Sequence, residues 1–117
     1  MKVGEAASLM GAKGDSLSAE LFDKQIADFS IDSRSVGAGE LFFALSQEDY
    51  ARAGFNGDFA DGHEFIGEAF SRGAIAAVGR VDKVRDNDRL REIKDRLLLV
   101  DDVIAALQRL ARKVYAS

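Results

Sequence analysis

The 117-residue chain has the size of one domain, and its 47% hydrophobic and 31% charged residues are ordinary for a globular protein. A formal net charge of −4 predicts no basic surface, so neither nucleic acid nor an anionic membrane is expected as a partner. The lack of cysteine excludes disulfides and thiolate metal sites, and a single histidine argues against a zinc site, so no metal is expected. No apolar run has membrane-spanning length and the N-terminus does not resemble a signal peptide, so the cytoplasm is the expected location.

The first predicted element is a short amphipathic helix over residues 3–12, whose apolar residues follow helical spacing and which Gly11 ends. Residues 11–16 are predicted to form a surface turn. They are not a phosphate-binding loop, because the GxxxxGK[ST] spacing is absent and the segment follows a helix instead of a strand. Residues 17–24 are predicted to form a small strand or an irregular connection.

Two strands are predicted in the next part of the chain. Residues 27–31 alternate apolar and polar side chains, as a half-buried strand does. Residues 41–45 are an apolar run too short for a helix, which predicts a strand buried on both faces. Because Gly37 and Gly39 allow the chain to reverse, we expect the two strands to form a hairpin-like unit joined by a polar turn.

A polar loop is predicted for residues 46–60. It is longer than the usual connection of about 4–6 residues. It contains three aromatic residues, Tyr50, Phe55 and Phe59, and these predict an ordered loop that packs against another part of the protein.

A helix is predicted to begin at Asp61, with Glu64 as the partner in a capping box, and to end at Gly73. The apolar run at 74–78 follows directly and predicts a strand. Residues 80–96 carry many charges of both signs, which predicts a solvated connection with some helix.

The chain is predicted to continue with a buried strand over residues 97–100 and a helix capped by Asp101 or Asp102. The apolar stripe of this helix consists of Val103, Ile104, Leu107, Leu110, Ala111 and Val114. A helix, a glycine and a strand in close succession favour α/β layers. The expected fold class is therefore α/β, a small single domain with a roughly four-stranded sheet and helices packed against it.

The polar cluster Asp32-Ser33-Arg34 lies where the first strand ends, and ligands of α/β sheets are commonly bound at strand ends. One interpretation is a ligand held by the Ser33 hydroxyl and backbone groups, with Arg34 available for phosphate. The other is a turn braced by local hydrogen bonds, with Arg34 paired to a carboxylate. His63 is open to the same two interpretations, as a donor to a ligand oxygen or as a structural residue. No complete catalytic constellation is evident.

Several motifs, in order and covering most of the chain, resemble the N-terminal domain of the Mur ligases, and within that family the D-alanyl-D-alanine-adding branch. The motifs are Ile31-Asp32-Ser33-Arg34, Gly39-Glu40-Leu41-Phe42-Phe43-Ala44-Leu45, Asp61-Gly62-His63-Glu64-Phe65-Ile66, Ala69 with Gly73-Ala74, and Val100-Asp101-Asp102 with Ala106-Leu107-Gln108-Arg109-Leu110-Ala111.

This resemblance implies a three-domain cytoplasmic enzyme of peptidoglycan precursor synthesis. In that family a central P-loop domain binds ATP and magnesium and phosphorylates the terminal carboxylate of a UDP-N-acetylmuramoyl peptide. An amine then attacks the acyl phosphate and forms an amide. Residues 1–117 resemble the first domain, which binds the UDP part of UDP-N-acetylmuramoyl-tripeptide and by itself catalyses nothing. The implied partners are that substrate and the central ATPase domain of the same polypeptide, which holds the ATP and magnesium.

The substrate-binding positions that the resemblance implies are Ile31, Ser33, Arg34, Ser46, Gln47 and His63. The first two match family positions that contact the uracil. Ser46 and Gln47 match the start of a loop that lies along the uridine and diphosphate, and Arg34 is implied either to bind phosphate or to brace the turn. One departure is Ala38, which stands where the family commonly has proline and should make the turn less rigid.

Residues 46–60 form a longer stretch than in the diaminopimelate- or lysine-adding relative, and this length favours the D-alanyl-D-alanine-adding branch. Two alternatives to that branch stay open. The first alternative is the same domain of that relative, which acts on the UDP-N-acetylmuramoyl dipeptide. The second is a stand-alone protein-interaction module whose contact surface is the aromatic loop at 46–60.

Overall fold

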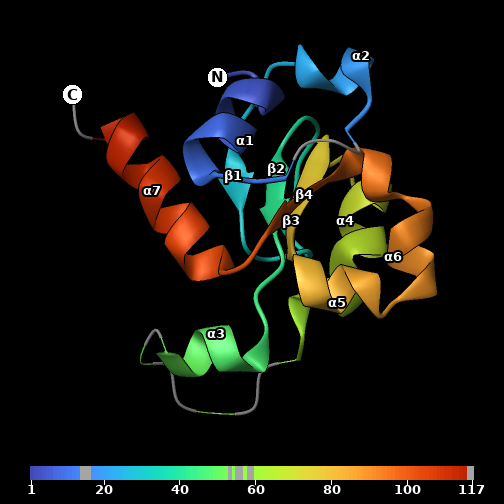
Figure 1. Ribbon diagram of the computed structural model, residues 1–117, viewed down its shortest axis with the longest axis vertical. Helices are drawn as coiled ribbons and strands as arrows, with labels where there is room; N and C mark the ends of the chain where they lie inside the picture. Colours follow the sequence, from blue (N-terminus) through green and yellow to red (C-terminus); the bar gives the residue numbers. More distant parts are fainter. Residues whose placement is uncertain (14–16, 53, 55–56, 58–59, 116–117) are drawn as a thin grey trace.

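Four short strands form the centre of the computed structural model, which describes residues 1–13, 17–52, 54, 57 and 60–115. The strands are β1 (Phe29–Ser30), β2 (Leu41–Phe43), β3 (Ala76–Arg80) and β4 (Leu97–Val100). They lie in the order β1-β2-β3-β4, and each strand runs parallel to its neighbour (Figure 1). The predicted α/β class with a four-stranded sheet is confirmed.

Helices precede, connect and follow the strands. They are α1 (Val3–Met10) and α2 (Ala19–Phe22) before β1; α3 (Gln47–Arg52), the 3₁₀ helix η1 (Gly62–Phe65) and α4 (Ile66–Ser71) between β2 and β3; α5 (Val81–Arg85), α6 (Asp88–Glu92) and the 3₁₀ helix η2 (Lys94–Arg96) between β3 and β4; and α7 (Val103–Tyr115) after β4. Within the described ranges, no helix combines the length and the apolar character that crossing a membrane requires.

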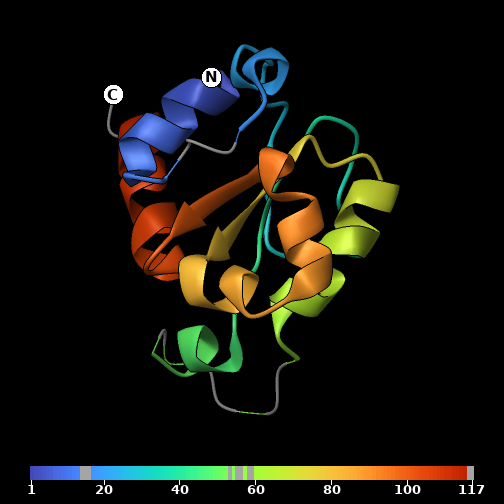
Figure 2. The same cartoon turned by 45° about the vertical axis from the view of Figure 1, so that its right-hand side comes forward.

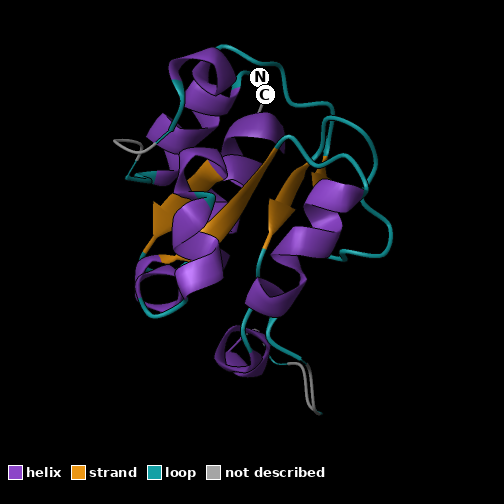
Figure 3. Ribbon diagram, turned by 90° about the vertical axis from the view of Figure 1, so that its right-hand side faces the viewer, coloured by secondary structure: helices purple, strands orange, loops and turns teal. Residues whose placement is uncertain are grey.

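Each face of the sheet has its own hydrophobic core, because side chains along a strand point alternately to opposite faces. Leu41 and Phe43 pack on one side with buried residues of α1 and α7. Phe42, between them in sequence, packs on the other side with buried residues of α4, α5 and α6. Figures 2 and 3 show the sheet lying between these two helical layers.

The strand order explains which helices share a face. Crossovers between neighbouring parallel strands are right-handed, so three successive crossovers in one direction place their connecting elements on the same side of the sheet. The β2–β3 and β3–β4 crossovers supply α4, α5 and α6 to that side. The β1–β2 crossover, residues 31–40, contains only turns and bends. The helical layer on this side therefore lacks the helix that the β1–β2 crossover would supply.

The predicted hairpin is wrong, because β1 and β2 run parallel, with Phe29 beside Leu41. The glycines do not reverse the chain in one tight turn. Residues 31–40 instead return the chain to the end of the sheet at which both strands begin, and Gly39 in this segment has a φ of 77°. There the Gly39 carbonyl accepts a hydrogen bond from the Ala27 N–H and its own N–H donates to Gly73. The burial of β2 on both faces, which was predicted, is typical of an interior parallel strand.

Two segments predicted without helix contain one. Residues 17–24 include α2, which forms because the Ser18 hydroxyl oxygen caps it by accepting from the Leu21 N–H at 3.2 Å. The loop predicted at 46–60 begins with α3. Of its aromatic residues, Tyr50 packs against the core beneath α1 and α7, whereas Phe55 and Phe59 lie outside the described residues.

The other predicted elements are confirmed with small shifts at their ends. Gly11 ends α1 in the left-handed conformation, with a φ of 66°. The Asp61 carboxylate caps η1, although its partner is the His63 N–H, at 3.0 Å. Asp102 is the residue that caps α7, accepting from the Ala105 N–H at 3.1 Å. The strands at 74–78 and 97–100 correspond to β3 and β4, and the charged connection contains α5 and α6.

Gly62 is the point at which η1 touches the chain leaving β2, and its replacement should weaken the fold. A Cβ atom at this position would lie 2.7 Å from the Leu45 nitrogen and 2.9 Å from the Leu45 oxygen. Because backbone atoms cannot swing aside, Gly62→Ala is expected to lower the free energy of unfolding by about 1–3 kcal/mol.

The matched control for this substitution is Gly67→Ala in α4. A Cβ atom there has no neighbour within 4 Å, so the change is expected to raise the free energy of unfolding by up to about 1 kcal/mol through helix propensity. Urea titrations of both variants measure the difference. Equal stabilities of Gly62→Ala and the wild type would contradict the proposed close approach.

Candidate functional site

A cleft of about 660 Å³ lies at the carboxyl ends of β1 and β2. Its lining residues are Ile31, Asp32, Ser33, Arg34, Phe42, Tyr50, Ala60, Gly62, Phe65 and Glu68. Residues 31–34 follow β1, and η1 and α4 supply the opposing side. The cleft exists because the β1–β2 crossover has no helix, since a helix in that position would pack beside α4 and fill the space.

Apolar side chains give this cleft the character of a binding surface. The aromatic residues Phe42, Tyr50 and Phe65 line it from three different elements, and Phe42 is almost fully buried, at 1% exposed. Ile31 is 47% exposed, although a large aliphatic side chain is normally buried. An exposed isoleucine beside aromatic rings in a concavity is suited to burying the face of a planar ring.

The turn formed by Asp32, Ser33 and Arg34 is held by local hydrogen bonds. Asp32 Oδ1 accepts from the Arg34 N–H at 2.9 Å and from Arg34 Nε at 3.1 Å, and Asp32 Oδ2 accepts from Arg34 Nη2 at 3.2 Å. The hydrogen bonds from the Arg34 side chain and backbone lower the pKa of Asp32. The same contact raises the pKa of Arg34. The guanidinium is thus already paired with a carboxylate, as the turn-bracing interpretation expects.

Ser33 differs from its two neighbours in having unused polar groups. It is only 7% exposed and lines the cleft. Within the described ranges, no residue forms a hydrogen bond with its hydroxyl or its backbone N–H. Because no buried side-chain oxygen of the described residues lacks a partner, the unbonded Ser33 hydroxyl is open to the cleft, and with the N–H it is available to a ligand that has polar groups on its edge.

Ser46 and Gln47 do not line the cleft. The Ser46 N–H and hydroxyl both donate to Asp49 Oδ2, at 2.8 and 3.0 Å, and the hydroxyl oxygen accepts from the Asp49 N–H. Gln47 is exposed, and its Nε2 donates to the Gly57 carbonyl at 2.9 Å. Both residues organise the start of α3, the helix from which Tyr50 reaches the cleft.

His63 is also absent from the cleft lining, and both nitrogens of its ring are engaged within the protein. Nε2 accepts from the Arg80 N–H at 2.9 Å, so the ring is protonated on Nδ1, which donates to Asp61 Oδ1 at 2.6 Å. The ring is 5% exposed. In this arrangement His63 connects η1 to the end of β3. Of its two interpretations from the sequence, the contacts therefore favour a structural residue over a donor to a ligand.

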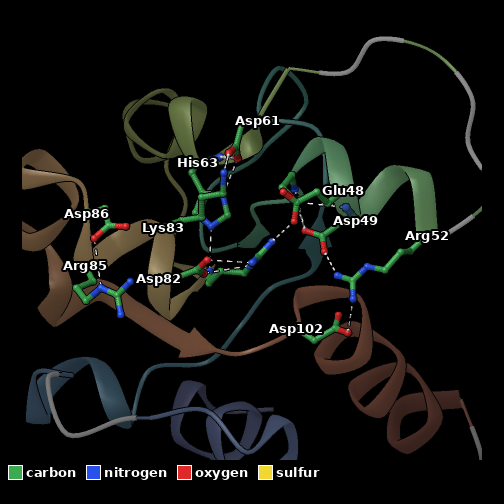
Figure 4. Close-up of polar contacts among 12 residues, drawn as sticks. Glu48, Asp49, Arg52, Asp61, His63, Asp82, Lys83, Arg85, Asp86 and Asp102 are labelled. Atoms are coloured by element: carbon green, nitrogen blue, oxygen red, sulfur yellow. Dashed lines mark hydrogen bonds and ion pairs between the residues drawn. The ribbon is translucent and has the colours of Figure 1, made fainter.

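A buried carboxylate connects α3 to α7. Asp49 is 0% exposed, and its Oδ1 accepts from Arg52 Nη2 at 2.7 Å. Arg52 Nη1 lies 3.2 Å from Asp102 Oδ2, and Asp102 is the cap of α7. This chain of contacts ties the segment after β2 to the segment after β4 (Figure 4).

A second set of ion pairs joins η1, α3 and α5 at the carboxyl ends of the strands. Arg80 contacts Glu48 at 3.0 Å and Asp82 at 2.9 Å. The Lys83 ammonium lies 3.1 Å from Asp61, which also holds His63 (Figure 4). These contacts connect η1, α3 and α5 to one another and to β3 at the carboxyl ends of the strands.

Seven lining residues were not singled out as ligand contacts by the sequence analysis: Asp32, Phe42, Tyr50, Ala60, Gly62, Phe65 and Glu68. Gly62 and Phe65 belong to the motif that runs from Asp61 to Ile66, in which only His63 was assigned to the ligand. Tyr50 was identified only as part of an aromatic loop. Glu68 lies on the polar side of α4, and no pattern in the sequence distinguishes it from other surface carboxylates.

The cleft is built for binding. Among the described lining residues, no base contacts the Ser33 hydroxyl, so the wall has no activated nucleophile. Aromatic rings, an exposed aliphatic side chain and two unused hydrogen-bonding groups can hold a flat heterocycle with polar edges.

Most of the chain is similar to known proteins. The profile described as Mur ligase family, catalytic domain, matches residues 25–115. The UDP-N-acetylmuramoyl-L-alanyl-D-glutamate--2,6-diaminopimelate ligase of Chelativorans sp. (strain BNC1) is 37% identical over 86 residues, which cover 74% of this chain and 15% of that protein.

Solved structures show the same fold. Crystal structure II of MurF from Acinetobacter baumannii aligns with a TM-score of 0.64 and 21% identity, covering 98% of this chain and 21% of that chain. Crystal structure I of the same protein aligns with a TM-score of 0.60 and 20% identity, covering 94% of this chain and 20% of that chain. The chain spans between about a seventh and a fifth of the length of these relatives.

The hydrogen bonds around Asp61 predict an acid-dependent loss of stability. Burial raises the pKa of Asp61, but the hydrogen bonds from His63 and Lys83 outweigh it, so the pKa lies below its ordinary value of 3.8. A carboxyl with a depressed folded-state pKa stabilises the fold above its unfolded-state pKa, and this contribution disappears as the pH falls through the folded-state pKa.

Asp61→Asn retains an oxygen for the His63 N–H but cannot titrate. We therefore expect the free energy of unfolding to fall less steeply for Asp61→Asn than for the wild type between about pH 5 and about pH 2. Urea titrations at a series of pH values measure both slopes. Identical slopes would show that Asp61 is not held in its charged form by these contacts.

Proposed function

The chain belongs to the Mur ligase family, and on this premise we propose that its cleft binds the uridine end of a UDP-N-acetylmuramoyl peptide. The observation that carries the proposal is Ser33, whose hydroxyl and N–H lack partners among the described residues although the residue is almost buried in the cleft wall. Ile31 and Ser33, the two positions that the family resemblance assigns to uracil, both line this cleft.

Uracil suits such a cleft for chemical reasons. Its ring is planar, which matches the aromatic residues Tyr50 and Phe65 and the exposed side chain of Ile31. Its edge carries carbonyl oxygens and an N–H, which are groups that a serine hydroxyl and a backbone amide can recognise. The cleft volume of about 660 Å³ lies in the range of small-molecule sites.

The wider role follows from the family. We propose that this domain serves peptidoglycan precursor synthesis in the cytoplasm, within a polypeptide whose other parts form an amide through an acyl phosphate. The chain contains no GxxxxGK[ST] motif, so ATP and magnesium are assigned to a central ATPase domain and the domain alone is expected to be inactive. Binding of a remote nucleotide then orients the reacting carboxylate, which is how non-reacting parts of a substrate contribute to rate.

The D-alanyl-D-alanine-adding reaction on UDP-N-acetylmuramoyl-tripeptide is the proposed branch of the family. The length of the 46–60 segment supports it. The relative that is 37% identical is a 2,6-diaminopimelate ligase, and this keeps the diaminopimelate-adding reaction as the second candidate. The solved structures are too distant in sequence, at 20 and 21% identity, to separate the two.

An assay of the full polypeptide containing this chain separates these two branches. UDP-N-acetylmuramoyl-tripeptide with D-alanyl-D-alanine is expected to support ATP-dependent amide formation, and UDP-N-acetylmuramoyl-dipeptide with diaminopimelate is not. Turnover with the dipeptide substrate alone would assign the chain to the second candidate.

Ser33→Ala is expected to weaken binding of UDP-N-acetylmuramoyl-tripeptide to the 117-residue chain about two- to tenfold, because one hydrogen bond is lost. Stability should change little, since no described residue depends on the Ser33 hydroxyl for a hydrogen bond. Amide chemical shifts recorded during a ligand titration measure the dissociation constant, and urea titration measures stability. An unfolded Ser33→Ala variant would favour the turn-bracing role of this residue, and unmoved resonances around the wild-type cleft would refute the proposed function.

A further inference from the structure

We infer that Asp32 determines what the cleft selects, because it holds the Arg34 guanidinium and so directs the site to the nucleoside part of the ligand instead of to its phosphates. This inference rests on the proposed function and deepens it. It decides between the two roles of Arg34 that the sequence left open, and it makes Asp32 a specificity-determining residue.

The first step is the geometry of the pair. Arg34 places Nε 3.1 Å from Asp32 Oδ1 and Nη2 3.2 Å from Asp32 Oδ2, which is a two-pronged contact that occupies one edge of the guanidinium. The Arg34 backbone N–H also donates to the same carboxylate, at 2.9 Å. Both oxygens of Asp32 are therefore directed to Arg34, and the pair presents no net charge to a ligand.

The second step is the charge of the whole cleft. Its ionisable lining residues are Asp32, Arg34 and Glu68, which are two carboxylates and one guanidinium. Glu68 in turn contacts Arg72 Nε at 3.3 Å. A diphosphate entering the cleft therefore meets no unpaired cation among the described lining residues, and it lies close to two carboxylates.

The third step concerns the cations at the carboxyl ends of the strands, next to the cleft. These cations are also neutralised, because Arg52 contacts Asp49 and Asp102, whereas Arg80 contacts Glu48 and Asp82. Lys83 is paired with Asp61. Because each of these cations already has a carboxylate partner, they do not supply a ready anion site beside the cleft.

The resulting ligand preference is specific. Hydrogen bonds and ring burial in the cleft recognise a neutral nucleoside, and the two phosphates add little attraction while Asp32 is charged. Removing the charge of Asp32 while keeping its shape would release Arg34 to a phosphate. The contribution of one solvent-exposed charge pair corresponds to about a two- to fivefold change in affinity.

The experiment measures dissociation constants for uridine and UDP by amide chemical-shift titration of the 117-residue chain at low ionic strength. The variants are Asp32→Asn, Arg34→Gln and the double variant. Asp32→Asn keeps an oxygen that accepts from the Arg34 N–H, so the turn retains that hydrogen bond. Glu20→Gln is the matched control, because it removes one carboxylate from α2 and lines no part of the cleft.

The wild type, Arg34→Gln and Glu20→Gln are expected to bind uridine and UDP with similar affinity. Asp32→Asn is expected to bind UDP about two- to fivefold more tightly relative to uridine, and this gain should disappear in the double variant and at high salt. A wild type that prefers UDP and loses the preference in Arg34→Gln would overturn the inference. An unchanged ratio in Asp32→Asn would do so as well.

The outcomes also separate this inference from the proposed function. If the wild type binds neither uridine nor UDP, the proposed function fails and the inference fails with it. If uridine binds in the cleft but the ratios differ from those expected, only the inference about Asp32 is overturned. Arg34→Gln tests the same point independently of whether Asp32→Asn folds.

Discussion

The crossover between β1 and β2 is the constraint on which the candidate site depends. Parallel neighbouring strands are usually joined by a dozen or more residues that include a helix, whereas here residues 31–40 return the chain with turns and bends alone. The helical layer over this face consequently begins at α4, and space remains beside Phe42. The strand order never reverses, so the sheet has no switch-point crevice, and the candidate cleft lies instead at the carboxyl ends of β1 and β2.

Rigid surroundings turn that space into a defined cleft. The contacts of His63 with Asp61 and Arg80 hold η1 against β3, and the Asp49–Arg52–Asp102 chain holds α3 near α7. In the sequence, His63 was a candidate ligand contact, and Asp61 and Asp102 were expected as helix caps. Their work in the fold is to fix the elements that carry Gly62, Phe65 and Tyr50, the residues that complete the cleft.

Charge pairing gives the molecule its second general property. A chain with a net charge of −4 has no long-range attraction for a nucleotide, and the cations around the cleft are bound to carboxylates. Under the proposed function, recognition of the ligand would come from shape, ring burial and a few unused hydrogen-bonding groups such as those of Ser33. Such a site is suited to holding the end of a long substrate while its reacting carboxylate extends to another part of an enzyme.

The sequence alone determined the α/β class and the residues that end or cap three helical segments, Gly11, Asp61 and Asp102, because apolar periodicity and capping residues act locally. The family resemblance pointed to Ile31, Ser33 and Arg34, and all three line the cleft. The direction of β1 against β2, the pairing of Arg34, and the internal role of His63 were decided only by tertiary structure. Turn residues are compatible with either a hairpin or a short crossover, and the partner of a charged or imidazole group depends on segments far away in the chain, such as Arg80 for His63. Local patterns carry no information about such distant neighbours, so long-range packing had to settle them.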